Sequence, residues 1–70
     1  MDTQQILNTL PANVVERLEW YKVESETENK VYKEHIRRAG AGYVTGLFDA
    51  GLITDGERKE LFLYFITITG

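Results

Sequence analysis

The apolar residues of this chain recur at helical spacing over most of its length. Val14, Leu18 and Tyr21 follow one another at steps of four and three residues, and the same steps resume after a polar stretch. The second series consists of Tyr32, Ile36, Ala39, Tyr43 and Leu47. Steps of three and four place side chains on one face of an α-helix. The pattern therefore predicts an all-α protein.

The polar stretch leaves two alternatives open for residues 11–50. Ser25 and Glu28 stand where the series would place apolar side chains. Either one long central helix begins at Pro11, a residue that suits a first helical turn, or two helices meet at a joint at residues 26–29. A continuous helix ending at Ala50 would be about 60 Å long at ~1.5 Å per residue. A domain this short could not cover that length alone, so the first alternative favours a partner.

Two shorter helices are expected on either side of this central segment. A short N-terminal helix covers roughly residues 3–8. Gly51 suits the left-handed position that follows a helix, and Thr54 with Glu57 fits a capping box. We expect a C-terminal helix from Asp55 to about Ile66, folded back as a helical hairpin, with residues 65–69 either helical or extended. The whole chain, 1–70, is then a single helical domain.

Small residues predict where the returning helix packs. Ala39, Gly42, Gly46 and Ala50 share one face of the central helix at helical spacing. Each interior glycine costs about 1 kcal/mol relative to alanine, and a face that accepts this cost usually admits another backbone. Because a short connection favours antiparallel neighbours, we expect the C-terminal helix to pack there. The alternatives are a bend at Gly40 and, more weakly, a phosphate beside Arg37 and Arg38.

The composition excludes several kinds of site and of chemistry. The chain has no cysteine and one histidine, which rules out disulfides and the usual zinc sites. Ser25 is the only serine and His35 the only histidine, so no nucleophile–base pair is apparent. We expect no catalytic residue, no metal and no cofactor. Small domains without such links gain stability by oligomerising or by docking on another protein, so we expect a homo-oligomer, a host-protein partner, or both.

The sequence also bears on location. The longest apolar run, residues 61–66, is far shorter than the ~20 residues that span a bilayer. The N-terminus lacks the basic and apolar regions of a signal peptide. We therefore expect a cytoplasmic protein without membrane partners.

Aromatic residues suggest a protein-binding function. Trp20 and Tyr21 lie in an acidic half of the chain, away from the hairpin, and aromatic side chains of this kind are enriched at binding hot spots. We predict a non-enzymatic protein-binding module. Its candidate contact residues are Leu18, Trp20, Tyr21, Phe62, Tyr64 and Phe65. The patch formed by the first three is covered either by the N-terminal helix or by a partner.

A basic segment supports an alternative function. The formal net charge is −3, yet residues 30–46 carry four bases and one acid. Lys30, Lys33, Arg37 and Arg38 would bind phosphates if the protein were a small nucleic-acid regulator. Nucleic acid is the less favoured partner because the chain as a whole is acidic.

The C-terminal third of the chain carries a resemblance. The segment Gly42–Thr54 (GYVTGLFDAGLIT), continued by Glu57–Phe65 (ERKELFLYF), is similar to small uncharacterised proteins of phages and mobile elements of Firmicutes. The resemblance implies a helical hairpin. It also implies a context in which compact proteins act as inhibitors or adaptors of host defence or regulatory proteins. It assigns no catalytic or binding residue.

Overall fold

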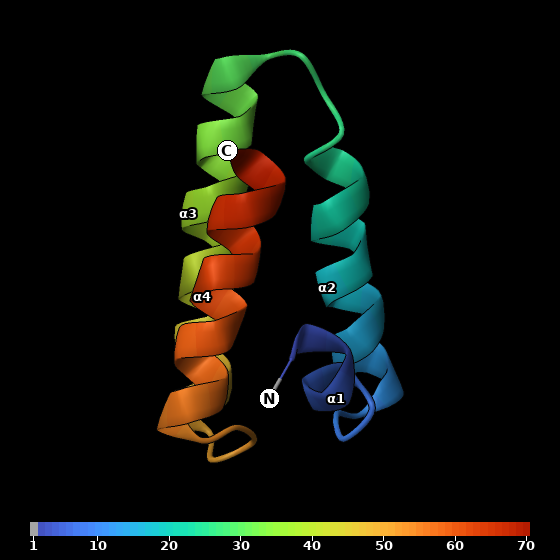
Figure 1. Ribbon diagram of the computed structural model, residues 1–70, viewed down its shortest axis with the longest axis vertical. Helices are drawn as coiled ribbons and strands as arrows, with labels where there is room; N and C mark the ends of the chain where they lie inside the picture. The colour runs from blue at the N-terminus through green and yellow to red at the C-terminus, as the bar shows by residue number, and fades with distance from the viewer. Residues whose placement is uncertain (1) are drawn as a thin grey trace.

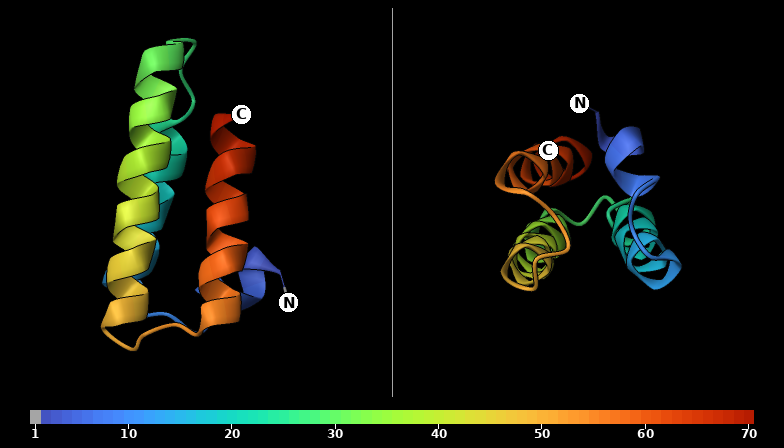
Figure 2. Two further views of the ribbon diagram at one scale, coloured as in Figure 1. Left: turned by 90° about the vertical axis from the view of Figure 1, so that its left-hand side faces the viewer. Right: turned by 90° about the horizontal axis from the view of Figure 1, so that it is seen from below.

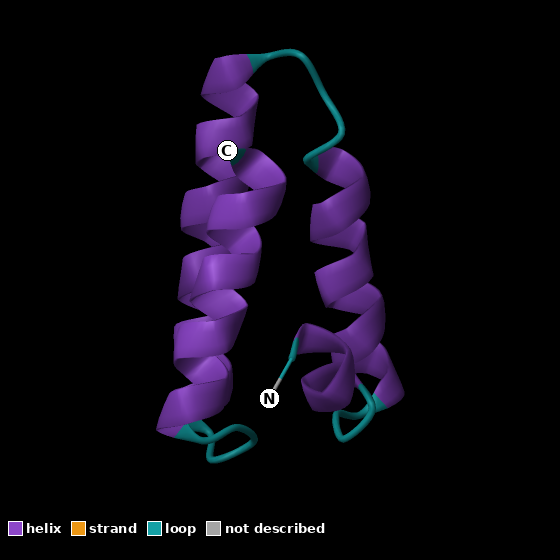
Figure 3. Cartoon of the chain, in the orientation of Figure 1, coloured by secondary structure: helices purple, strands orange, loops and turns teal. Residues whose placement is uncertain are grey.

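The computed structural model describes residues 2–70, where all regular structure is helical (Figure 3). The helices are α1 (Thr3–Leu7), α2 (Ala12–Glu24), α3 (Lys30–Asp49) and α4 (Asp55–Thr69). The predicted all-α class is confirmed, and so is the C-terminal helix that folds back on its predecessor. Because α4 continues to Thr69, the segment that could have been extended forms its last turns.

The three longer helices run alternately up and down as a bundle (Figure 1). α3 and α4 make the most extensive contact, and α2 lies along α3. The short α1 covers one end of the bundle, beside α2 and α4 (Figure 2). The molecule measures 32 × 20 × 19 Å. Its longest dimension is thus close to the ~30 Å expected for a helix of the length of α3.

Residues 25–29 separate α2 from α3. The central segment therefore consists of two helices and not of one long helix. α2 ends at Glu24, and the Ser25 hydroxyl donates a hydrogen bond back to the Lys22 carbonyl oxygen. Asn29 caps α3, its side-chain oxygen accepting from the Tyr32 backbone N–H at 3.0 Å. Polar side chains that bond to the backbone in this way favour helix ends. The reversal turns the apolar faces of α2 and α3 toward one core.

The turn between α3 and α4 has the geometry that the sequence predicts. Gly51 has a φ of 77°, the left-handed conformation that glycine adopts most readily. The Leu52 backbone N–H donates to the Leu47 carbonyl oxygen at 3.0 Å, as in a Schellman motif. Thr54 and Glu57 cap α4 reciprocally, each side chain bonding to the other residue's backbone N–H. These contacts fix the antiparallel course of α4.

The core is organised around a glycine of α3 and an aromatic ring of α4. Gly40 is buried, and a Cβ atom added to it would lie 2.5 Å from Phe65 Cδ1 and 2.6 Å from Cζ. Carbon atoms normally approach to about 3.5 Å, so no side chain fits at this position. α3 is continuous through Gly40, without the bend considered above. The buried residues packed into one core are Ile6, Val14, Leu18, Val44, Leu47, Ile53, Leu61 and Phe65.

The predicted packing face of Ala39, Gly42, Gly46 and Ala50 is wrong. Gly42 and Gly46 are exposed, and a Cβ atom on either would meet nothing within 4 Å. The buried residues of α3 are Ile36, Gly40, Val44 and Leu47. Gly42 and Gly46 each follow a buried residue of α3, Gly40 and Val44 respectively, by two positions, about 200° around a helix. α4 therefore packs on a different face of α3.

Two matched substitutions test this arrangement. We expect Gly40→Ala to lower the free energy of unfolding by about 2 kcal/mol, because the added methyl overlaps the Phe65 ring. Gly46→Ala should raise it by about 0.5–1 kcal/mol, because alanine is the better helix former at an exposed site. Urea unfolding of the two variants provides the measurement. Equal effects at both positions would contradict the assigned packing face.

Candidate protein-binding surface

Trp20 is an exposed aromatic side chain whose inner side packs against another ring. It is 45% exposed, although it packs edge-on against Tyr21 with ring centroids 5.3 Å apart. Tyr21 in turn packs edge-on against the buried Phe65 at 5.5 Å. Trp20 is thus the outer end of an aromatic series that reaches into the core. A side chain fixed in this way loses little conformational freedom when a partner covers it.

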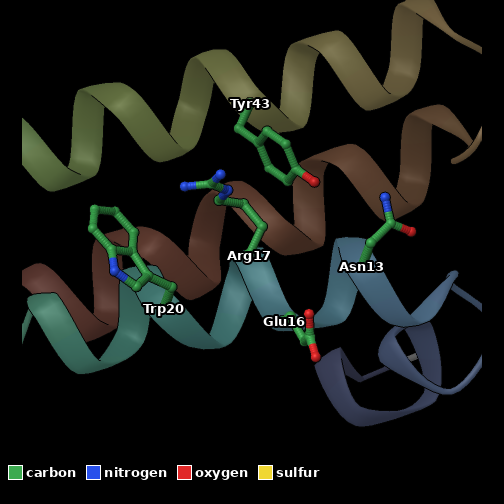
Figure 4. A pocket seen from close by; sticks show the side chains of 5 residues that line it. All are labelled: Asn13, Glu16, Arg17, Trp20 and Tyr43. Atoms are coloured by element: carbon green, nitrogen blue, oxygen red, sulfur yellow. The ribbon is translucent and has the colours of Figure 1, made fainter.

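Trp20 borders an open hollow between α2 and α3, which we call the α2–α3 groove. Its volume is about 480 Å³. Figure 4 shows Trp20 and Asn13 toward its two ends, with Arg17 reaching from α2 toward Tyr43 of α3. The lining residues are Asn13, Glu16, Arg17, Trp20 and Tyr43. Its walls are provided by two helices of the rigid bundle and not by a loop.

The groove combines aromatic surface with opposite charges. The Arg17 guanidinium carbon lies 5.6 Å from the centre of the Trp20 ring, a cation–π distance. Tyr43 packs against Tyr21 with centroids 5.9 Å apart, which leaves its edge in the groove. Glu16 adds a carboxylate beside these groups. Aromatic and arginine side chains are the types enriched in protein–protein interfaces.

Two of the six predicted contact residues belong to the core. Leu18 and Phe65 are each 1% exposed, so almost all of either side chain is covered by the folded chain itself. Tyr21 is partly buried and supports Trp20 from the inside.

The remaining two predicted residues lie on different sides of α4. Phe62 stands beside α3, with the Arg58 guanidinium carbon 5.5 Å from its ring centre. Tyr64 is close enough to Glu19 of α2 for that carboxylate to affect its ionisation. The structure therefore joins Tyr64 to the aromatic series through Phe65 and leaves Phe62 on a separate surface.

Some of the small residues of α3 share a face with Tyr43. Ala39, Gly46 and Ala50 lie four, three and seven positions from Tyr43. They do not line the groove, and Gly42 is turned about 100° from Tyr43. Gly42, Gly46 and Ala50 are exposed, so most of the face that the sequence assigned to α4 is open.

The basic segment divides into two parts. Lys30, Lys33 and Arg37 line a second hollow of about 390 Å³, closed on its other side by the last residues of α4. Arg38 does not line it and forms an exposed ion pair with Glu34 at 2.8 Å. The four bases therefore do not form a single cluster.

Sequence reasoning missed part of the groove. Arg17 precedes Trp20 by three residues, a spacing that places the two side chains side by side on a helix. That signal was present in the sequence. The same helical spacing places Asn13 on this face, three and four residues before Glu16 and Arg17. No comparable signal identifies Tyr43, because its proximity depends on the chain reversal at residues 25–29.

Comparisons with known proteins return no relative. A scan of protein-family models finds no match to this chain, and searches of curated proteins and of solved structures find none either. Across residues 2–70, no three histidine or acidic side chains are grouped so that they could hold a metal ion. Within the same residues, none of the helices has the length and apolarity needed to cross a membrane.

The position of Tyr64 predicts a pH dependence of stability. Burial raises the pKa of its phenol, and the charge of Glu19 raises it further. Because an unfolded tyrosine ionises near pH 10, the free energy of unfolding should fall as the pH rises above about 10. In the Tyr64→Phe variant, the free energy of unfolding should decrease less over the same pH range. Denaturant unfolding at a series of pH values provides the measurement. The same decline in both proteins would show that Tyr64 is not buried against α2.

Proposed function

We propose that this protein is a non-enzymatic binding module that attaches to another protein through the α2–α3 groove. The observation that carries the proposal is Trp20, a half-exposed tryptophan at the edge of the groove and anchored through Tyr21 to the core. Large aromatic side chains in fixed positions supply much of the affinity of protein interfaces. Here Trp20 is the anchor, and Arg17 with Glu16 provides polar contacts around it.

An exposed glycine of α3 supports the same surface. Gly46 lies about one helical turn from Tyr43 and costs about 1 kcal/mol relative to alanine in a helix. No other part of the folded chain comes within 4 Å of a Cβ atom placed at this position. No contact inside the molecule therefore offsets this loss of helix stability. Close packing of a partner backbone along α3 would offset it.

The resemblance of the C-terminal third to proteins of phages and mobile elements suggests the kind of partner. We propose a bacterial host protein of the defence or regulatory machinery, with this chain as its inhibitor or adaptor in the cytoplasm. A second copy of the chain is the other candidate, in which case the module acts as a homodimer.

Nucleic-acid binding is the alternative function, and it receives less support. Lys30, Lys33 and Arg37 gather at one hollow, but Arg38 is paired with Glu34 outside it. The chain also has a net charge of −3, which disfavours binding to phosphates.

A capture experiment with matched variants tests the proposal. The tagged protein is used to capture partners from a Firmicutes lysate, with and without nuclease, and bound proteins are quantified by mass spectrometry. A specific partner should survive nuclease, and Trp20→Ala should weaken its binding roughly 30-fold, the loss typical of an aromatic hot spot. Val31→Ala is the control, since Val31 is 79% exposed and does not line the groove.

A second variant separates binding from stability. Gly46→Gln should leave the fold intact, because its side chain meets nothing within 4 Å, yet it should obstruct a partner helix. Full capture by both Trp20→Ala and Gly46→Gln would refute the groove as the binding surface. Loss of every captured species on nuclease treatment would favour the nucleic-acid alternative. Size-exclusion chromatography with light scattering reports whether the partner is a second copy.

A further inference from the structure

A second exposed surface runs along the outer side of the contact between α3 and α4, which we call the α3–α4 seam. Its centre is an apolar hollow of about 260 Å³ formed by Ala41, Phe62, Phe65 and Ile66, with Arg37 at its edge. Ile66 is 52% exposed. On α3 the seam uses positions 37, 41 and 48, whereas the groove uses Tyr43, which lies about 200° around the helix from Ala41. The two surfaces therefore lie on different sides of α3.

Cationic side chains lie at both ends of the seam. At one end Arg37 also lines the basic hollow with Lys30 and Lys33, so the apolar and basic surfaces are continuous. At the other end the Arg58 guanidinium carbon lies 4.9 Å from the ring centre of Phe48. The seam thus extends from Lys30 to Phe48, about 27 Å at ~1.5 Å per helical residue.

The cations at the basic end have no acidic partner in the folded chain. The ion pairs formed by residues 2–70 are those of Arg38 with Glu34 and of Arg58 and Lys59 with Asp55. Lys30, Lys33 and Arg37 belong to none of them. Glu34 borders the same hollow, but its carboxylate is held by Arg38.

We infer that the α3–α4 seam binds an acidic amphipathic helix of a partner protein. Its apolar residues would enter the hollow between Ala41, Phe62 and Ile66, and its carboxylates would pair with Lys33 and Arg37. The hollow is smaller than the ~300–1,000 Å³ of typical small-molecule sites, and suits individual side chains. Helices commonly bind to grooves of this kind through apolar anchors at helical spacing. Lys and Arg beside the anchors then select for acidic sequences.

One feature favours a protein segment over nucleic acid at this surface. The middle of the seam is apolar and offers no donors to a phosphate backbone, whereas the apolar side chains of an amphipathic helix would fit there.

This inference goes beyond the proposed function, because it gives the protein a second binding face. With partners in the groove and on the seam, the chain would bridge two proteins, which is the behaviour of an adaptor. A failure at the seam leaves the groove untouched, since Trp20 belongs to the groove alone.

Selection from a displayed peptide library tests the inference. The probe is a random library of peptides about 16 residues long, roughly four helical turns, selected against the intact protein. Enriched peptides should carry apolar residues at helical spacing and an excess of Asp and Glu. One enriched peptide, made synthetically, is then titrated against the labelled protein, and its site is mapped from backbone amide NMR shifts.

Matched variants assign the binding to the seam. Ile66→Asp and Lys33→Glu should each weaken the peptide roughly tenfold or more. Leu63→Asp and Lys22→Glu are the controls, because Leu63 is 58% exposed elsewhere on α4 and Lys22 is an exposed cation of α2. Trp20→Ala should bind the peptide as the unaltered protein does. Thermal melting confirms that each variant is folded.

Several results would overturn the inference. These are the absence of any enriched peptide, enrichment of neutral or basic peptides, or amide shifts confined to the α2–α3 groove. Binding of a labelled single-stranded RNA that is lost in Lys33→Glu, without enrichment of acidic peptides, would assign the surface to nucleic acid instead.

Discussion

The close packing of Phe65 against Gly40 is the contact on which the rest of this structure depends. A side chain at position 40 would occupy the same space as the ring. Because the ring lies directly on the α3 backbone, α3 and α4 form a tight antiparallel pair, and Phe65 is also available to Tyr21 of α2. One residue thus joins the three long helices. In a chain with no disulfide to link them, such contacts must hold the bundle together.

The same packing determines which surfaces remain open. Once α4 covers the Gly40 side of α3, Gly42 and Gly46 on a different face are left exposed. The aromatic series from Phe65 through Tyr21 then ends at Trp20, on the rim of the α2–α3 groove. The α3–α4 seam is the outer edge of the tight pair itself. Both proposed binding surfaces are therefore consequences of how the core is packed.

The sequence predicted those features of the fold that depend on local chemistry. The capping box at Thr54, the left-handed Gly51 and the all-α class all follow from nearby residues. The packing face of α3 did not, because glycines stand on two faces of this helix, and only the contact with Phe65 distinguishes Gly40 from Gly42 and Gly46. The candidate site was predicted in part. Trp20 is exposed as expected, whereas Leu18 and Phe65 are buried. The groove needs Tyr43 beside Arg17, a proximity that arises only after the chain reverses.

The fluorescence of Trp20 tests the central claim most directly, because it is the only tryptophan in the chain. In the free protein its emission should be that of a partly exposed indole and should be quenched by acrylamide. When the captured partner is added, in a form without tryptophan, the emission should shift to shorter wavelength and the quenching should decrease. An unchanged spectrum and unchanged quenching in the saturated complex would contradict the account, since the partner would then be bound somewhere other than the α2–α3 groove.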